Sequence, residues 1–420
     1  MEHYIFYCKL SLLAVLSLIT ACCMLSRRWY VNLAAFLACL SGETFLAHLF
    51  FPGYMLCPAA ASFIILFLSR IWDLSRTSAK GNGADPIRLP VRSGIRESRL
   101  EFYYYYSNFL VYGEAGSGKT KSIGKWLLSE YMRLGFAGFI YDFKDTDYTR
   151  TAYNLIKRHR YPHKFYYVSF DRPERSYRFN PLKVVRDRTE LIQLMEDVLL
   201  ALLPKKEQQN EWVAGGLGIL RGVAFRFWDE FPEHCTLPHI LAFIMTASAR
   251  QLSLFLQQNL VSEMLAGAYL KAEGSEKTQA SYLSTLCNNL ATVSQNEEIA
   301  YVLSGDDFDF NLIDPENPKL FAISNNFSKN SVYAPVIGML MSTSSRQFTM
   351  RNKVPFVYFL DEMTTVNIRN FETMPSVLRE YKVGFVLQTQ SGSKVENQYG
   401  RLDRSSVEAN FGNQFFGRTK

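Results

Sequence analysis

The chain has 420 residues, of which 48% are hydrophobic and 20% are charged, so it can bury a large core and is not a disordered protein. Its seven cysteines are too few for a disulfide scaffold, and its net charge of +7 is compatible with an anionic partner without requiring one. At roughly 150 residues per domain, this length predicts about three structural units.

The first seventy residues contain three apolar runs, over 10–25, 30–51 and 54–68. Each run approaches the roughly 20 residues that a membrane-spanning helix needs, although the third is short. A cleaved signal peptide fits the first run poorly, because residues 1–3 contain no Lys or Arg and the basic pair Arg27-Arg28 follows the run. We therefore expect a membrane anchor over 1–72.

Charge bias decides the expected topology of this anchor. Three spans with the N-terminus outside place both Arg27-Arg28 and the basic stretch after Arg70 on the inner side. Glu43 within the second run costs about 2.5–3.5 kcal/mol on insertion scales, so it faces a neighbouring helix or the run is a re-entrant hairpin. The net-basic connector over 73–100 is expected to lie against anionic lipid, with nucleic-acid contact as the alternative.

The strongest motif follows a short apolar strand expected over 108–112. Its pattern is G-x-x-x-x-G-K-[ST], and a helical pattern over 121–134 comes directly after it. Glycines let backbone N–H groups surround phosphate oxygens, the lysine offers a cation to the β- and γ-phosphates, and the hydroxyl can ligate Mg²⁺. The motif predicts a site for ATP and Mg²⁺ formed by Gly113, Glu114, Ala115, Gly116, Ser117, Gly118, Lys119 and Thr120.

A second acidic segment completes the expected nucleotide site. The apolar run 355–360 is typical of a buried parallel strand and ends in Asp361 and Glu362. We expect Asp361 to hold Mg²⁺ through water and Glu362 to polarise the attacking water. The alternative is a strand that ends in a solvated acidic turn.

Further apolar runs, separated by helical patterns, predict strands at 138–141, 165–170, 319–324, 383–387 and 414–416. This order predicts an α/β fold with a doubly wound parallel sheet. Between 187 and 300, leucines and aromatic residues recur at helical spacing, which predicts an all-α subdomain inserted into the sheet.

Gln390 follows a strand beside the nucleotide strand, where it either senses the γ-phosphate or is an ordinary polar strand end.

These patterns predict five segments along the chain. They are the transmembrane anchor 1–72, the basic juxtamembrane connector 73–100, the first part of the P-loop nucleotide-binding domain 101–186, the helical subdomain 187–300 and the second part of the nucleotide-binding domain 301–420.

The order of these features resembles the conjugative coupling ATPases of type IV secretion systems, the TraG/TraD family, and within it the Bacteroidetes-type mobilisation coupling proteins. The segments 179–182, 305–308 and 412–417 are similar to that family as well. The resemblance implies a RecA-like sheet and a homo-hexameric ring at the bacterial inner membrane, with a multi-pass anchor and a cytoplasmic ATPase domain. It also implies membrane lipid, relaxase-bound single-stranded DNA of the relaxosome and the secretion channel proteins as partners.

The resemblance also assigns roles to particular residues. It implies that Lys119 and Thr120 are the Walker A pair, that Asp361 and Glu362 are the Walker B pair, and that Gln390 is the motif glutamine. Arg379 lies where family members carry an arginine that reaches the ATP of the next subunit, which makes it a candidate arginine finger in trans. The alternative for Arg379 is a helix-end arginine on a solvated face.

Two departures from the family pattern stand out. Lys394 occupies a position where the family often has a second glutamine, and the chain stops at Lys420, where family members usually continue. We therefore expect the C-terminal part of the sheet to be lacking here.

Three functions follow from these interpretations. The first is an ATPase that recruits relaxase-bound DNA and drives single-stranded DNA into a secretion channel. The second is a membrane-anchored adaptor that uses nucleotide only as an assembly switch, and the third is an FtsK-like DNA translocase. The catalytic carboxylates favour the first function over the adaptor, and the absence of a DNA-reading tail disfavours the third.

Overall fold

The computed structural model describes residues 85–417, apart from 94–95, 144–145 and 204–206, together with short pieces of the first fifty residues (5–7, 9–11, 41, 44–45 and 48–49). The expected membrane runs and most of the connector therefore lie outside the described residues. Within the described residues, no helix is both long and apolar enough to cross a membrane. Residues 1–84 and 85–420 form two separate units.

The second unit begins with an antiparallel hairpin of β1 (Ile87–Ser93) and β2 (Arg96–Phe102). Ile87 and Leu89 are buried and Arg88 between them is half-buried, which is the alternation of a strand with one core face. The backbone N–H of Arg88 donates to Oε2 of Glu130 at 2.8 Å, which ties the hairpin to α4 (Lys125–Arg133). The interpretation of 73–100 as a connector missed this hairpin, because it weighed the charges and not the alternation of the apolar residues.

A seven-stranded parallel sheet forms the centre of this unit. Its strands lie in the order β5-β6-β4-β7-β8-β3-β9, so the connections cross over repeatedly. Each strand coincides with an expected one to within two residues at either end. The strands are β3 (Phe109–Tyr112), β4 (Ala137–Asp142), β5 (Lys164–Ser169), β6 (Lys319–Ser324), β7 (Phe356–Leu360), β8 (Val383–Thr389) and β9 (Asn413–Phe416).

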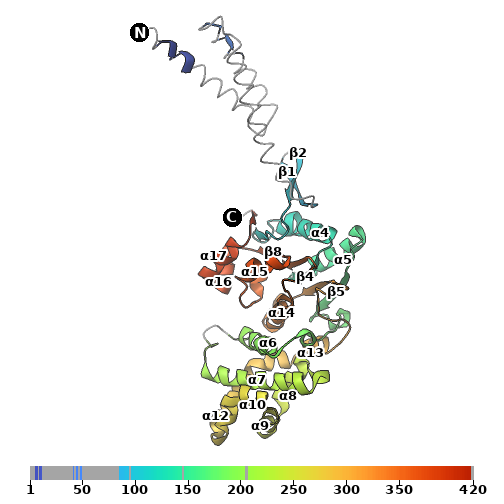
Figure 1. The fold of residues 1–420 in the computed structure, drawn as a ribbon, viewed down its shortest axis with the longest axis vertical. Helices are drawn as coiled ribbons and strands as arrows, with labels where there is room; N and C mark the ends of the chain where they lie inside the picture. Colours follow the sequence, from blue (N-terminus) through green and yellow to red (C-terminus); the bar gives the residue numbers. More distant parts are fainter. Residues whose placement is uncertain are drawn as a thin grey trace. The chain divides into compact units, whose positions relative to one another are not determined.

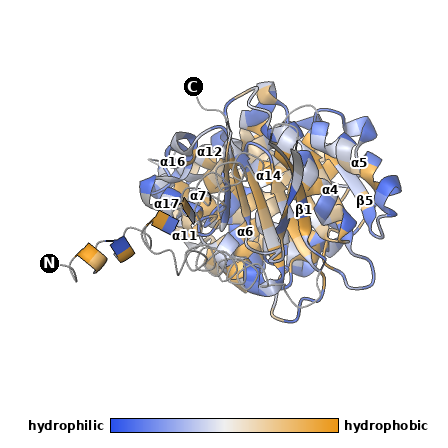
Figure 2. Ribbon diagram, turned by 90° about the horizontal axis from the view of Figure 1, so that it is seen from above, coloured by the Kyte–Doolittle hydropathy of each residue, from blue (hydrophilic) through white to orange (hydrophobic). Residues whose placement is uncertain are grey.

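Both faces of the sheet are covered, which explains why its central strands are continuous apolar runs. Val357 and Phe359 face the layer formed by α4, α5 (Asp147–His159) and the hairpin. Tyr358 and Leu360, on the opposite face, pack in a second cluster that includes α14 (Asn330–Ser345) and the inserted helices. In Figure 2 the central strands are mostly orange and the outer surface of α5 is blue, which agrees with this two-sided burial.

Between β5 and β6 the chain forms a helical insertion, which confirms the expected α/β fold with inserted helices. Figure 1 shows these helices gathered on one side, with α14 between them and the sheet. The main helices of the insertion are α6 (Arg188–Ala201), α7 (Glu211–Glu230), α8 (Leu237–Thr246), α9 (Ala249–Gln257), α10 (Leu260–Leu265), α11 (Gly267–Lys271), α12 (Glu276–Ser294) and α13 (Glu297–Leu303).

Glycines in α7 allow its neighbours to pack closely. A Cβ atom at Gly218 would lie 2.8 Å from the carbonyl oxygen of Leu265, and one at Gly222 would lie 2.9 Å from that of Ser262. Backbone atoms cannot move aside as the end of a flexible side chain can. Glycine at these positions therefore permits the contact between α7 and α10 that forms the centre of the insertion.

The strand order brings three chain segments to one edge of the sheet. In parallel strands the carboxyl ends lie together, and β8 lies between β3 and β7. The segments that follow these strands, which begin at Gly113, Gln390 and Asp361, are therefore neighbours. Crevices outside the carboxyl ends of the strands are the usual ligand sites of open α/β sheets.

Candidate functional site

The loop of residues 113–120 connects β3 to a π-helical turn, η2 (Thr120–Gly124), that leads into α4. Gly116 and Gly118 have φ angles of 80° and 85°, which side chains with a Cβ rarely adopt. A Cβ atom on Gly113 would lie 2.4 Å from Oγ of Ser117. The loop therefore depends on glycine both for its backbone angles and for its tight closure.

Lys119 lies across this loop and meets a carboxylate from another strand. Its Nζ atom donates to the carbonyl oxygen of Gly113 at 2.9 Å and to Oε1 of Glu362 at 2.7 Å. The side chains of Lys119 and Glu362 are only 4% and 2% exposed, so this is a buried ion pair. Burial of two charges is costly unless they are paired, so each group depends on the other.

Asp361 and Glu362 stand at the carboxyl end of β7. The backbone N–H of Asp361 donates to the carbonyl oxygen of Tyr141 at 3.0 Å, which extends the pairing with β4 by one residue. Glu362 has a φ of 46°, a left-handed conformation that a residue with a long side chain seldom adopts. Such strained residues persist where the surrounding structure holds them, and they cluster at functional sites.

Gln390, the first residue after β8, approaches the same carboxylate. Its Nε2 atom lies 3.4 Å from Oε1 of Glu362, and its Oε1 atom accepts a hydrogen bond from Nζ of Lys394 at 2.6 Å. The structure thus brings Lys119, Glu362 and Gln390 together, as the motifs led us to expect. Lys394, which the sequence interpretation treated only as a departure from a family pattern, belongs to the same group.

Tyr148 and Gln388 form a buried floor below the loop that sequence reasoning missed. The hydroxyl of Tyr148 donates to Oε1 of Gln388 at 2.7 Å, and a Cβ atom on Gly124 would lie 2.1 Å from that hydroxyl. Burial and the nearby charge of Asp361 raise the pKa of Tyr148 well above its ordinary value, while hydrogen bonds with Gln388 and Thr120 oppose the rise. The sequence signal for this floor was a polar glutamine inside an otherwise apolar strand.

Some polar atoms around the loop are buried and unsatisfied. Within the described residues, Oγ of Ser117 and Nε2 of Gln388 have no hydrogen-bond partner. Most buried polar atoms in proteins are paired, so those that are not mark places where a ligand or water can be bound. The loop thus offers polar groups in the position that a phosphate-binding loop requires.

Arg379 lies at the opposite edge of the sheet. It is exposed in η9 (Leu378–Tyr381), directly before the amino end of β8. A seven-residue strand is roughly 20 Å long, so this guanidinium is far from the loop of its own chain. Arg379 is therefore not part of the group formed by Lys119, Glu362 and Gln390.

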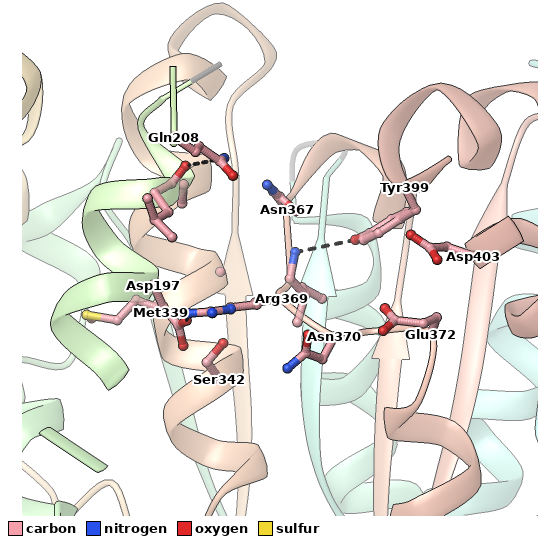
Figure 3. Close-up of a pocket in the computed structure, with 14 residues that line it drawn as sticks. Asp197, Gln208, Met339, Ser342, Asn367, Arg369, Asn370, Glu372, Tyr399 and Asp403 are labelled. Carbon is pink, nitrogen blue, oxygen red and sulfur yellow. Dashed lines mark hydrogen bonds and ion pairs between the residues drawn. The ribbon is translucent and has the colours of Figure 1, made fainter. Parts of the chain in front are cut away.

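A cavity of about 210 Å³ lies where the segment after Glu362 meets the helical insertion. Figure 3 shows Arg369 pointing from this segment to Asp197 of α6, and Tyr399 meeting the backbone of Ile368. Asp197 is buried between Arg369 and Arg346, with its nearer oxygen 2.7 Å from Arg346. Burial raises the pKa of Asp197, while the two guanidinium groups oppose the rise.

A second hollow, of about 410 Å³, carries a surplus of positive charge. Four of its lining side chains are cationic and only Asp309 among them is anionic. Lys183 and Arg186 have carboxylate neighbours, at 2.7 Å and 3.6 Å, whereas Arg351 and Lys353 form no ion pair within the described part of the chain. We call this hollow the basic groove, and its cations are Lys183, Arg186, Arg351 and Lys353.

The parallel sheet, the helical insertion and the glycine-rich loop after β3 define an α/β protein of the phosphate-loop type. The sequence model of the family described as type IV secretory system conjugative DNA transfer matches residues 94–419, and the chain belongs to this family. The resemblance drawn from the sequence motifs is therefore confirmed.

Solved structures of a bacterial conjugative coupling protein, TrwB, are similar in fold. A form lacking its N-terminal segment, in complex with sulphate, has a TM-score of 0.60 and 17% identity over 81% of this chain and 75% of that one. The complex of TrwB with ADP and Mg²⁺ has a TM-score of 0.59 and 18% identity over 79% of each chain. The complex with a non-hydrolysable ATP analogue has a TM-score of 0.56 and 19% identity over 73% of this chain and 70% of that one. No curated protein matches the chain.

Proposed function

We propose that this protein is the ATPase coupling protein that recruits relaxase-bound DNA and drives transfer of single-stranded DNA into a type IV secretion channel. One observation carries the proposal. The cation of the phosphate loop, Lys119, and a carboxylate suited to activate water, Glu362, meet at the carboxyl edge of the sheet, with Gln390 beside them. This combination fits hydrolysis of a nucleoside triphosphate, because nucleotide binding alone would not need a carboxylate that activates water.

Each residue of the site would have a separate role in hydrolysis. The backbone of residues 113–118 would bind the phosphates of ATP. Lys119 would break its ion pair with Glu362 and would itself contact the β- and γ-phosphates. Glu362, released from its ion pair, would accept a proton from the attacking water. Mg²⁺ would be held by Thr120 and Asp361, whose oxygens are the ligand type that it prefers, and it would neutralise charge on the phosphates.

Assembly into a homo-hexameric ring would give Arg379 its role. Its exposed position at the amino end of β8 leaves it free to contact a neighbouring subunit. An arginine that is always charged and has several donors is suited to stabilise the transferring phosphoryl group. We therefore propose Arg379 as an arginine finger in trans.

The basic groove is our candidate for contact with the DNA backbone. Its cations come from two separate segments of the chain, around 183–186 and 351–353. Its lining includes no aromatic side chain on which a base could stack, so the contact would be to phosphates and independent of base sequence. The cations of the groove thus suit a protein that carries any single strand attached to its relaxase.

Membrane anchorage through residues 1–72, at the bacterial inner membrane, completes the proposal. The ATPase unit would lie in the cytoplasm, where relaxase-bound DNA is available, and the anchor would place it beside the channel proteins and membrane lipid. The apolar runs and the basic residues that follow them support this placement.

Replacement of Glu362 by Gln in cells that lack the native protein tests the proposal. Transfer of a mobilisable DNA should fall to the level of the deletion strain, while the variant still binds ATP. A membrane-anchored adaptor that uses nucleotide only for assembly would retain transfer with the same variant.

A further inference from the structure

Gln390 can help to catalyse hydrolysis only if its amide is turned the right way. A glutamine side chain presents a carbonyl oxygen on one side and two N–H donors on the other, and the two orientations have nearly the same shape. Beside Glu362 only the N–H group is useful, because a carbonyl oxygen would face a carboxylate. Something must therefore select this orientation.

Lys394 makes that selection in the structure. Its ammonium can only donate, so it requires the carbonyl oxygen of Gln390, from which it lies 2.6 Å away. Glu362 can only accept when it is ionised, so it requires the N–H group, which lies 3.4 Å from its Oε1 atom. The two neighbours thus demand the same orientation of the amide.

The position of Lys394 in its helix supports a specific role. It lies in the first turn of α16 (Gly392–Tyr399), where a cation faces the positive end of the helix dipole and is disfavoured. The nearby carboxylate of Glu396 is paired with Arg404 at 3.0 Å. Among the described residues Lys394 forms no ion pair, and its ammonium donates to Gln390.

We propose that Lys394 is a positioning residue, which fixes the amide of Gln390 with its N–H group toward Glu362 and the reacting phosphate. It acts through Gln390 and does not itself contact ATP. This inference rests on the proposed ATPase function, since it assigns a role in that same reaction.

Three variants at position 394, two that remove the positive charge and one that keeps it, separate this role from a merely structural one. Lys394→Met removes the donor and should lower kcat by roughly threefold to tenfold, with KM for ATP changed by less than about twofold. Lys394→Glu should lower kcat further, because an acceptor at 394 attracts the N–H group and turns the carbonyl oxygen toward Glu362. Lys394→Arg keeps the donor and should restore kcat to within about twofold of the wild type.

The decisive comparison is in a Gln390→Ala background. If Lys394 acts through Gln390, none of the three variants at 394 should change kcat in this background, because the amide that they act on is gone. Lys157, an exposed lysine of α5, provides the matched controls Lys157→Met and Lys157→Glu, which should leave kcat unchanged. A loss of kcat that persists in the Gln390→Ala background, or a rise in KM, would show direct contact with ATP and overturn the proposal.

A second measurement keeps the inference separate from the proposed function. If the wild-type 420-residue chain in detergent hydrolyses no ATP, the proposed function fails. The role of Lys394 can still be tested by denaturant unfolding without nucleotide. A carboxylate near the amino end of α16 is favoured by the helix dipole, so Lys394→Glu should raise the midpoint of denaturant unfolding in the Gln390→Ala background. When Gln390 is present, the same change should raise the midpoint less or lower it, because the contact with the amide is lost. Equal shifts in both backgrounds would contradict the positioning role.

Discussion

Nζ of Lys119 and Oε1 of Glu362 lie 2.7 Å apart, although the two residues are 243 positions apart in the chain. In the structure the cation that would bind phosphate and the carboxylate that would activate water therefore neutralise each other. In the proposed mechanism, ATP would break this ion pair when it binds and would so release Glu362 for catalysis. ATP binding and activation of the site would thereby be linked through a single contact.

This ion pair should be visible as coupling in stability measurements. Lys119→Met leaves the buried carboxylate of Glu362 without its cation and should lower the free energy of unfolding by about 3 kcal/mol. In the double variant Lys119→Met/Glu362→Gln the uncompensated charge is gone, so most of this loss should be recovered. Denaturant unfolding without nucleotide measures the cycle, and costs that simply add would show that the pair is not formed.

The basic groove should determine how DNA binding depends on salt. Each lysine or arginine that contacts a phosphate of single-stranded DNA contributes about 0.7 to the slope of log K against log salt concentration. Arg351→Ala and Lys353→Ala should each reduce the slope by about this amount, for oligonucleotides of any sequence. Fluorescence anisotropy over a salt series measures the slope, with Lys271→Ala in the helical insertion as the control. An unchanged slope in both groove variants would place the DNA elsewhere.

Two histidines near α4 and α5 should make stability depend on pH. Burial and the charge of Arg158 lower the pKa of His159, and burial lowers that of His163 although its contact with the carbonyl of Gly135 opposes this. Both histidines thus take up protons more readily in the unfolded chain. Their contribution to stability is present above about pH 6.5, the ordinary value of a histidine, and is lost as the pH falls below it.

Thermal unfolding between pH 5 and pH 7.5 should test this dependence. The midpoint should fall toward acid pH, and the fall should be smaller in the variant His159→Gln/His163→Gln. His234→Gln changes an exposed histidine of the insertion and should keep the wild-type dependence. A double variant that retains the full wild-type slope would assign the effect to other groups.

Much of this fold could be predicted from the sequence because its signals are local. A buried parallel strand is a continuous apolar run, and the loop 113–120 is specified by glycines that its own backbone requires. What could not be predicted comes from contacts between distant segments. The strand order that places β8 between β3 and β7 decides that Gln390 meets Glu362. The contact of Lys394 with Gln390 spans only four residues, but its effect on the site depends on that distant meeting.

Arg379 should matter only between subunits. Arg379→Ala should bind ATP as the wild type does, because the residue is remote from the loop of its own chain, and should lose hydrolysis by roughly a thousandfold or more. Mixing Arg379→Ala subunits with Glu362→Gln subunits should restore activity, since each supplies what the other lacks at a shared interface. Wild-type hydrolysis by Arg379→Ala alone would show that this arginine is an ordinary surface residue.

Steady-state ATP hydrolysis by the purified chain in detergent, with and without single-stranded DNA, tests the central claim most directly. We expect hydrolysis that DNA stimulates and that both Lys119→Ala and Glu362→Gln abolish, the second while still binding ATP. ATP binding that depends on Lys119, without any hydrolysis in the wild type, would contradict the claim that this chain is an ATPase and would favour a nucleotide-controlled adaptor.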